Sequence, residues 1–329
     1  MANNTNERKL IEVFTSFEGG KAQLPLMIKK ASQKGPRVFL VGVVHGEEVV
    51  GIEVIHRIFD GVKLKRGSIH AIPVANMAGF SMGTRAVPYG ESGDWINLNR
   101  AFPGDVNGRP GDKIAAAIYK TIVDAKPNLV IDIHADSHNS LPFILLDRFI
   151  EKPDAKLFKK TEEFAEAFGV TVCNDDDSES YATDGGESTL SGALFNRERL
   201  PAFTVELGGP MVINEPFVLS GVAGIRNILV KLNMLEDVVE PVVDSSKIQP
   251  GFRLRTMTVP AKETSGKIRY QAKVGDMVEK GQLLVTISDV FGRKQEEIHS
   301  PSDGFVISLG YQAISFPGMT LAILAVKDK

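Results

Sequence analysis

Two histidines and a glutamate follow apolar runs of strand length, and residues of these types can hold a divalent metal ion. His45 and Glu48 have the spacing His-x-x-Glu directly after the apolar run Arg37–Val44. His134 closes a second apolar run, Asn128–His134. Two imidazoles and one carboxylate give Zn²⁺ three protein ligands and leave one coordination position for water. Because such an ion acidifies its water and polarises a carbonyl, the pattern favours a hydrolytic site with one zinc ion.

A further carboxylate, Glu206, lies near the end of another apolar run, Pro201–Leu207. It is not needed as a ligand, so we expect it to act as the general base that takes the proton from water. Each pattern is weak by itself, because His-x-x-Glu occurs by chance and a lone histidine at a strand end is more often structural. Their common placement at strand ends favours the metal site.

Strand-like and helix-like patterns alternate over the part of the chain that holds these residues. We expect strands at 37–44, 67–74, 128–134, 142–146 and 201–207, and helices around 50–58, 113–125, 154–168, 190–199 and 220–235. This order predicts an α/β fold, with a mixed, mostly parallel sheet flanked by helices. In such sheets ligands gather at the carboxyl ends of the strands, which would bring distant residues together.

The pattern changes after about Pro241, where short alternating segments and frequent turn residues predict a small all-β domain. We therefore expect two domains, a zinc-dependent catalytic domain over residues 1–245 and an all-β domain over residues 246–329. The segment between Val242 and Pro250 is the expected linker.

Overall composition excludes several other classes of protein. The chain of 329 residues has 43% hydrophobic and 24% charged residues and a net charge of −3, so a nucleic-acid or anionic-membrane partner is not expected. The amino-terminal residues lack the apolar core of a signal peptide, and no run of about 18 apolar residues predicts a membrane span. The single cysteine, Cys173, cannot form an internal disulfide and is interpreted as a small core residue. A cytoplasmic location is expected.

Four motifs in order resemble the succinylglutamate desuccinylase/aspartoacylase family, a branch of the zinc carboxypeptidase fold. They are His45-Gly-Glu-Glu48, Asn97-Leu-Asn-Arg-Ala-Phe-Pro-Gly104, Asp132-Ile-His134 and Thr204-Val-Glu-Leu-Gly-Gly209. The resemblance extends over about residues 37–235. It implies that His45, Glu48 and His134 bind zinc and that Glu206 is the general base.

The same resemblance implies roles for two arginines and an asparagine. Arg85 corresponds to the arginine that stabilises the oxyanion, and Asn99 and Arg100 correspond to the pair that holds a substrate carboxylate. The planar fork of arginine suits carboxylate recognition, and a donor aimed at a developing oxyanion contributes strongly to catalysis. Without the motif, both arginines would be interpreted as solvated loop charges.

Several polar residues near the motifs have open roles. Asp132 shares a strand face with His134, so it either orients that ligand or has a structural role at the sheet end. Asp136, Ser137 and His138 follow the ligand and are candidates for lining a pocket, with a surface position the alternative for His138. The acidic run 175–177 lacks the ordered spacing of calcium ligands, so we interpret it as a solvated loop.

The C-terminal region is similar to biotinyl/lipoyl carrier domains in three segments, 274–282, 300–306 and 316–321. Carrier domains hold an acceptor lysine in a hairpin, commonly within Met-Lys-Met. The matching hairpin here, Val290–Gln295, lacks that motif and offers only Lys294. We therefore expect a role in packing, oligomerisation or the rim of the active site, without an attached group.

Three functions remain open from the sequence. The first is a zinc-dependent deacylase that hydrolyses the amide of a small N-acylated amino acid or related carboxylate-bearing molecule. The second is a metallocarboxypeptidase acting on peptides, and the third is a non-catalytic binding or carrier module. A homo-oligomer is possible for each of them.

Overall fold

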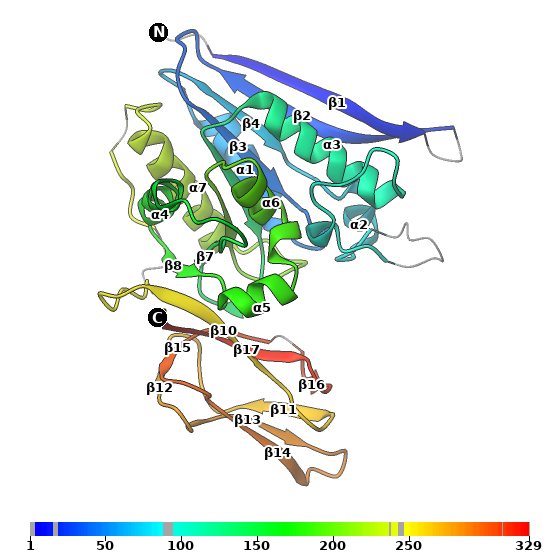
Figure 1. Ribbon diagram of the computed structural model, residues 1–329, viewed down its shortest axis with the longest axis vertical. Coiled ribbons are helices and arrows are strands. Elements are labelled where there is room, and N and C mark those ends of the chain that lie inside the picture. The colour runs from blue at the N-terminus through cyan, green and yellow to red at the C-terminus, as the bar shows by residue number, and fades with distance from the viewer. Residues whose placement is uncertain are drawn as a thin grey trace.

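The computed structural model describes residues 4–15, 19–87, 95–236, 238–242, 247–310 and 312–328. A large sheet of 13 strands extends through the protein, and a four-stranded sheet lies near its C-terminal end. Figure 1 shows the helices gathered around the N-terminal part of the large sheet, with the C-terminal strands at the opposite end of the molecule.

The strands of the large sheet, in spatial order, are β1 (Thr5–Thr15), β2 (Lys21–Lys30), β4 (Ser68–Ile72), β3 (Arg37–Gly42), β5 (Leu129–His134), β9 (Ala202–Glu206), β7 (Phe143–Leu146), β8 (Thr171–Asn174), β10 (Leu254–Pro260), β17 (Thr320–Lys327), β15 (Gly304–Leu309) and β12 (Met277–Val278), with β6 (Asn139–Ser140) paired to β15. The smaller sheet has the order β14 (Lys294–His299), β13 (Leu283–Ser288), β11 (Gly266–Tyr270) and β16 (Ile314–Ser315). The helices are α1 (Val50–Gly61), α2 (Met77–Met82), α3 (Pro110–Ala125), α4 (Ala155–Phe168), α5 (Ser178–Thr183), α6 (Leu190–Arg197) and α7 (Glu215–Lys231), with single 3₁₀ turns η1 (Leu98–Arg100) and η2 (Gly186–Ser188).

The centre of the large sheet is parallel, as the alternating pattern predicted. Strands β4, β3, β5 and β9 run in one direction, with Gly42 opposite Ile133 and His134 opposite Glu206. Strand β7 is antiparallel to β9, while β8 is parallel to β7. The sheet is therefore mixed, and the predicted α/β class is confirmed.

Two apolar layers of helices cover the two faces of this parallel centre. Helices α1, α4 and α7 pack on one face, which presents alternate residues such as Leu40, Ile133 and Val205. Helices α3 and α6 pack on the other face against Val130 and Ala202. Because side chains alternate along a strand, Asp132, His134, Thr204 and Glu206 belong to this second face. The polar residues at the ends of β5 and β9 thus lie on the face that α3 and α6 cover, and the hydroxyl of Thr204 contacts that of Ser191 of α6 at 3.1 Å.

Several elements were not expected or begin at other residues. The hairpin β1–β2 was missed because the outer strand β1 is mostly exposed and charged, although Leu24 and Leu26 on β2 are buried. Strand β8 and helix α5 are too short to produce a clear period. Helix α7 begins at Glu215, earlier than expected, because Pro216 fits the first turn of a helix.

The C-terminal strands continue the large sheet instead of forming a detached unit. Strand β10 pairs in parallel with β8, where Leu254 is opposite Cys173. Leu254 and Cys173 are buried in one apolar cluster that also contains Phe143, Ile307 and Ala325. The expected boundary between residues 245 and 246 falls within 243–246, which lie outside the described residues. The division into two domains stays a prediction.

Two expectations from the sequence concern the single cysteine and membrane-spanning segments. Cys173 is fully buried, and burial raises the pKa of its thiol to about 12, which fits a small core residue. Among the helices of the described residues, none has the length and apolar character needed to cross a membrane.

Candidate active site

The turn between β3 and α1 carries His45 and Glu48, and the end of β5 carries His134. The two strands are parallel neighbours, so the chain leaves the sheet beside His134 when it enters this turn. Val43 adopts a positive φ of 56°, which is uncommon for a β-branched residue and reverses the chain just before His45. Gly46 packs against α2 so closely that a Cβ atom there would lie 2.1 Å from the carbonyl carbon of Gly79. The turn is therefore fixed by packing on both sides.

The carboxylate of Glu48 joins the two histidines. Its Oε1 lies 2.7 Å from Nδ1 of His45, and its Oε2 lies 2.8 Å from Nδ1 of His134. The backbone N–H of Ala135 also donates to Oε2 at 3.1 Å. The three side chains are almost fully buried, and their candidate ligand atoms all lie within 4.8 Å of one another. The structure thus brings the three predicted metal ligands together.

The outer nitrogens of both imidazole rings are held by oxygen acceptors. Nε2 of His45 contacts Oδ1 of Asn97 at 3.1 Å, and Nε2 of His134 contacts Oδ2 of Asp132 at 2.9 Å. Because Nε2 of each ring donates to its oxygen acceptor, Nδ1 is the atom that can give up its proton and bind a metal ion beside Glu48. This is the arrangement that metal-binding histidines require.

Charges around Glu48 and His134 favour a cation between them. Burial raises the pKa of Glu48, but the charges of His45 and His134 and their hydrogen bonds outweigh it, and the pKa is held well below its usual range. Burial lowers the pKa of His134, but the charges of Asp132 and Glu48 raise it well above its usual value. Surroundings that favour a proton at this ring also favour a metal cation. The donor set of two imidazoles and one carboxylate fits Zn²⁺.

Glu206 ends β9, directly opposite His134 in the sheet. Its Oε2 atom is buried and has no hydrogen-bond partner within the described part of the chain. Burial raises the pKa of this carboxyl well above its usual range, and the charge of His134 opposes that effect. A carboxyl with an unpaired oxygen beside a metal site is able to exchange a proton with a bound water.

Arg85 reaches the same site from the loop after α2. Its Nη1 donates to Oε1 of Glu48 at 2.8 Å and lies 4.0 Å from Oε1 of Glu47. The side chain remains half exposed and lines the cavity next to the two histidines. The predicted oxyanion donor is therefore beside the candidate ligands, where it contacts one of them.

Asn99 and Arg100 lie in η1 and also line the cavity. Oδ1 of Asn99 accepts from the backbone N–H of Leu190, so its Nδ2 is the atom that could donate to a substrate. Arg100 donates from Nε to the carbonyl of Asp184 and from Nη1 to the carbonyl of Asn99, both at 2.8 Å. These two contacts fix the plane of the guanidinium group at the rim of the cavity.

All seven predicted site residues line one cavity of about 280 Å³. The C-terminal region contributes to it, since Thr258 of β10 also lines the wall. Ser308 of β15 donates a hydrogen bond to Asp136, and Ser137 donates to the carbonyl of Leu309 at 2.5 Å. Asp136 lines the cavity, whereas His138 is exposed outside it. The C-terminal region therefore contributes to the rim of the cavity, which is one of the three roles expected for it.

The cavity also contains residues that the sequence patterns did not single out. Asn97 was quoted within a motif, but its contact with His45 was not anticipated. Asp147 and Tyr181 lie deep in the cavity, and no motif pointed to them. The interpretation of run 175–177 as a solvated loop is wrong for Asp175 and Asp176, because both line the cavity. Asp176 pairs there with Arg255, which a local charge pattern does not reveal.

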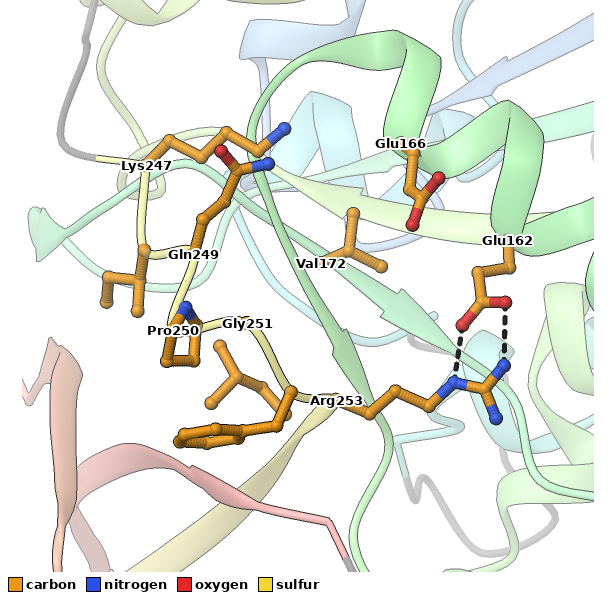
Figure 2. Close-up of a pocket in the computed structure, with 11 residues that line it drawn as sticks. Glu162, Glu166, Val172, Lys247, Gln249, Pro250, Gly251 and Arg253 are labelled. Atoms are coloured by element: carbon orange, nitrogen blue, oxygen red, sulfur yellow. Dashed lines mark hydrogen bonds and ion pairs between the residues drawn. The ribbon is translucent and has the colours of Figure 1, made fainter.

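A larger hollow of about 420 Å³ lies elsewhere, between α4 and residues 247–254 (Figure 2). Figure 2 shows Arg253 extended toward Glu162, and its Nε and Nη2 lie 2.7 and 2.8 Å from the two carboxylate oxygens. Among the described residues that line this hollow there is no histidine or cysteine. Two of its charged residues, Arg253 and Glu162, are paired with each other, so the smaller cavity at His45 is the better candidate for an active site.

Three known proteins resemble the chain over much of its length. The N-alpha-acetyl-L-2,4-diaminobutyric acid deacetylase of Halomonas elongata is 26% identical over 315 residues, covering 93% of this chain and 86% of that protein. The product-bound structure of the ectoine utilization protein EutE (DoeB) from Ruegeria pomeroyi has a TM-score of 0.81 at 20% identity and covers 99% of both chains. A metallo-carboxypeptidase from Burkholderia cenocepacia has a TM-score of 0.52 at 17% identity, covering 69% of this chain and 65% of its own. The last likeness supports the expected carboxypeptidase-like fold.

The family model of the succinylglutamate desuccinylase/aspartoacylase catalytic domain matches residues 34–232 of the sequence. These residues include β3, β5 and β9, and with them the cluster of His45, Glu48, His134 and Glu206. The predicted resemblance is confirmed, and because the match spans more than half of the chain, the protein belongs to the succinylglutamate desuccinylase/aspartoacylase family.

Proposed function

We propose that this protein is a zinc-dependent amidohydrolase that removes the acyl group from a small N-acylated amino acid. The observation that carries the proposal is the unpaired, buried Oε2 of Glu206 in the same cavity as the cluster of His45, Glu48 and His134. This combination offers a three-ligand metal site and a separate carboxyl for proton transfer. The deacylase names of the relatives agree with hydrolysis of a carbon–nitrogen bond outside peptides.

His45, Glu48 and His134 would hold one zinc ion, which supplies a polarised carbonyl and an acidified water when it is bound. Glu206 accepts the proton of the attacking water through its free oxygen. The water oxygen forms the new carbon–oxygen bond as this proton leaves it, and Glu206 then delivers the proton to the amide nitrogen as the carbon–nitrogen bond breaks. Arg85 turns its guanidinium from Glu48 to the carbonyl oxygen, where negative charge develops. The products are a carboxylic acid and a free amine.

The carboxylate of the substrate would bind at Asn99 and Arg100 in the wall of the cavity. Arg100 is held in place by two backbone carbonyls, so its remaining N–H groups are oriented without a large loss of entropy. Nδ2 of Asn99 adds a neutral donor next to it. A carboxylate fixed at this wall orients the amide relative to Glu206, which is how positioning contributes to rate.

The alternatives have weaker support. A carboxypeptidase that acts on long peptides needs an open groove, whereas this cavity is small and is lined by Thr258 of the C-terminal region and by Asp136, which accepts a hydrogen bond from Ser308. A carrier module needs an acceptor lysine, and the sole candidate Lys294 pairs with Glu297 at 2.8 Å in the smaller sheet. Zinc as the metal, the roles of individual site residues, a cytoplasmic location and a homo-oligomer remain proposals.

The test is a hydrolysis assay with zinc-loaded protein. The panel contains N-acetyl and N-succinyl amino acids, N-acetyl diamino acids, the corresponding amides without a carboxylate, and short peptides with the same C-terminal residues. Release of free amine should be fastest for an N-acylated amino acid and should be abolished by a zinc chelator. Faster cleavage of the peptides would support the carboxypeptidase instead. No release from any member of the panel by protein with bound zinc would contradict both enzymes.

A further inference from the structure

Asp147 lies deep in the active-site cavity and is not explained by the reaction proposed above. It follows β7, its side chain belongs to the same sheet face as Glu206, and it lines the cavity with only 5% of its surface exposed. Tyr181 of α5 donates a hydrogen bond to its Oδ1 at 2.9 Å. Its Oδ2 is buried and has no hydrogen-bond partner among the described residues. A buried carboxyl oxygen without a hydrogen-bond partner destabilises the folded state.

Nearby cations do not neutralise this carboxyl. The neighbouring Arg148 directs Nη1 and Nη2 to the two oxygens of Asp328, at 3.0 and 2.8 Å, and directs Nε to backbone carbonyls. Arg255 is close to the cavity wall but pairs with Asp176. Arg100 stays on carbonyls at the rim. Within the described part of the chain, the carboxyl of Asp147 therefore lacks a positive partner.

The cavity as a whole has an excess of acidic groups. Seven carboxyl side chains line it, against the two arginines Arg85 and Arg100: Glu48, Asp136, Asp147, Asp175, Asp176, Asp184 and Glu206. Glu48 is accounted for by the candidate metal site and Asp176 by Arg255. Burial and the charge of Asp175 raise the pKa of Asp147 to about 7, while the hydroxyls of Ser191 and Tyr181 oppose the rise. A cationic group entering the cavity would remove this penalty by pairing with the carboxylate.

We infer that Asp147, supported by Tyr181, binds a primary ammonium group of the substrate. The substrate would then be a short N-acylated diamino acid, with its carboxylate at Arg100 and its free ammonium group at Asp147. This assignment rests on the proposed deacylase activity and adds a specificity-determining residue to it. An ammonium group donates up to three hydrogen bonds, so it can satisfy the free Oδ2 of Asp147 and also donate to the hydroxyls of Ser191 and Thr204. These two hydroxyls line the same cavity and contact each other at 3.1 Å.

The experiment compares two substrates of equal shape. The N-α-acetyl derivative of 2,4-diaminobutyrate carries a terminal ammonium group, and N-acetylnorvaline carries a methyl group in its place. Zinc-loaded native protein should favour the ammonium substrate in kcat/KM by roughly 10²-fold, because a site built for a hydrogen-bonded charge rejects an analogue that lacks it. Equal kcat/KM values for the two substrates, or a preference for N-acetylnorvaline, would overturn the assignment.

Two variants separate Asp147 from the general charge of the cavity. Asp147→Asn should lower the preference to less than about tenfold, through a higher KM for the ammonium substrate. Asp184→Asn removes the same charge from an exposed position on the cavity wall and should keep most of the preference. If both variants retain the native preference, or both lose it equally, Asp147 does not select the ammonium group.

Binding measurements keep this test independent of the reaction and of the variants. Calorimetry with native protein should show tighter binding of 2,4-diaminobutyrate than of norvaline. If neither acetylated substrate is hydrolysed but this difference in binding is present, the deacylase proposal fails while the ammonium site stands. If N-acetylnorvaline is hydrolysed as fast as its partner and the two amino acids bind equally, the deacylase stands and the ammonium site fails.

Discussion

Asp132 and His134, two residues apart on β5, point to the same face of the sheet, and Oδ2 of Asp132 lies 2.9 Å from Nε2 of His134. The contact fixes the ring so that Nδ1 faces Glu48 at 2.8 Å. Both side chains are buried, so the orientation is maintained without exchange with water. The alternation of side chains along β5 thus places Asp132 where it orients His134, one of the candidate metal ligands.

Asp132→Asn should weaken zinc binding about 10- to 100-fold, the usual effect of removing a carboxylate that supports a ligating histidine. The asparagine retains the size of the side chain but loses its charge. Competition with a chromogenic chelator measures the zinc dissociation constant of the variant and of the native protein. Unchanged affinity would show that Asp132 has only a structural role at the end of the sheet.

Arg100→Lys should raise KM for N-acyl amino acids by about tenfold or more, because an ammonium group cannot contact two backbone carbonyls and a carboxylate in one plane. The carboxamide forms of the same substrates serve as the control and should be affected less. Steady-state kinetics on the two series give the comparison. Equal losses on acids and amides would remove Arg100 from carboxylate binding.

Asp147→Asn should change how stability depends on pH. The pKa of Asp147 is raised to about 7 by burial, against an ordinary value of 3.8. Between these values the folded protein holds a proton that the unfolded chain has released, so stability is greatest below the lower value and falls as pH rises to about 7. The asparagine does not titrate. Between pH 5 and pH 8, the free energy of unfolding of the native protein should therefore fall by on the order of 2 kcal/mol relative to that of the variant. The slope is about 1.36 kcal/mol per pH unit below the folded pKa and levels off above it.

Denaturant unfolding of both proteins at the two pH values measures this difference. The comparison between variant and native protein cancels the contributions of carboxyls that do not interact with Asp147, whereas Asp175, whose charge raises the pKa of Asp147, contributes to the measured difference. A constant difference between the two proteins from pH 5 to pH 8 would show that Asp147 does not titrate in this range.

The site residues that could be predicted from the sequence are those that lie at the ends of strands with a recognisable apolar pattern. His45, His134 and Glu206 each lie at the end of a strand with a clear apolar pattern, and the parallel order of β3, β5 and β9 brings those ends together. Asp147 follows β7, which is antiparallel to β9, so its depth in the cavity depends on a strand direction that no periodicity reveals. Tyr181 lies on α5, a helix too short to predict.

The contribution of the C-terminal strands also depends on long-range pairing. The pattern of turns after residue 250 predicted the β-structure but could not indicate that β10 pairs with β8. That pairing places Thr258 at the cavity and lets β15 approach Asp136. The β8–β10 pairing places Leu254 opposite Cys173, 81 residues earlier, and the contact between Ser308 and Asp136 joins residues 172 apart. Local sequence patterns carry no information about contacts of this kind.

Zinc content and turnover of Glu206→Gln, measured beside His134→Ala, test the central claim most directly. Glutamine keeps the size of the side chain but cannot accept the proton of water, whereas the alanine removes a ligand. We predict that Glu206→Gln retains close to one zinc ion per chain and loses about 10²- to 10⁴-fold in kcat, with a small change in substrate binding. His134→Ala should lose the metal itself. Loss of zinc from Glu206→Gln, near-normal turnover by it, or stoichiometric zinc and full activity in His134→Ala would contradict the account.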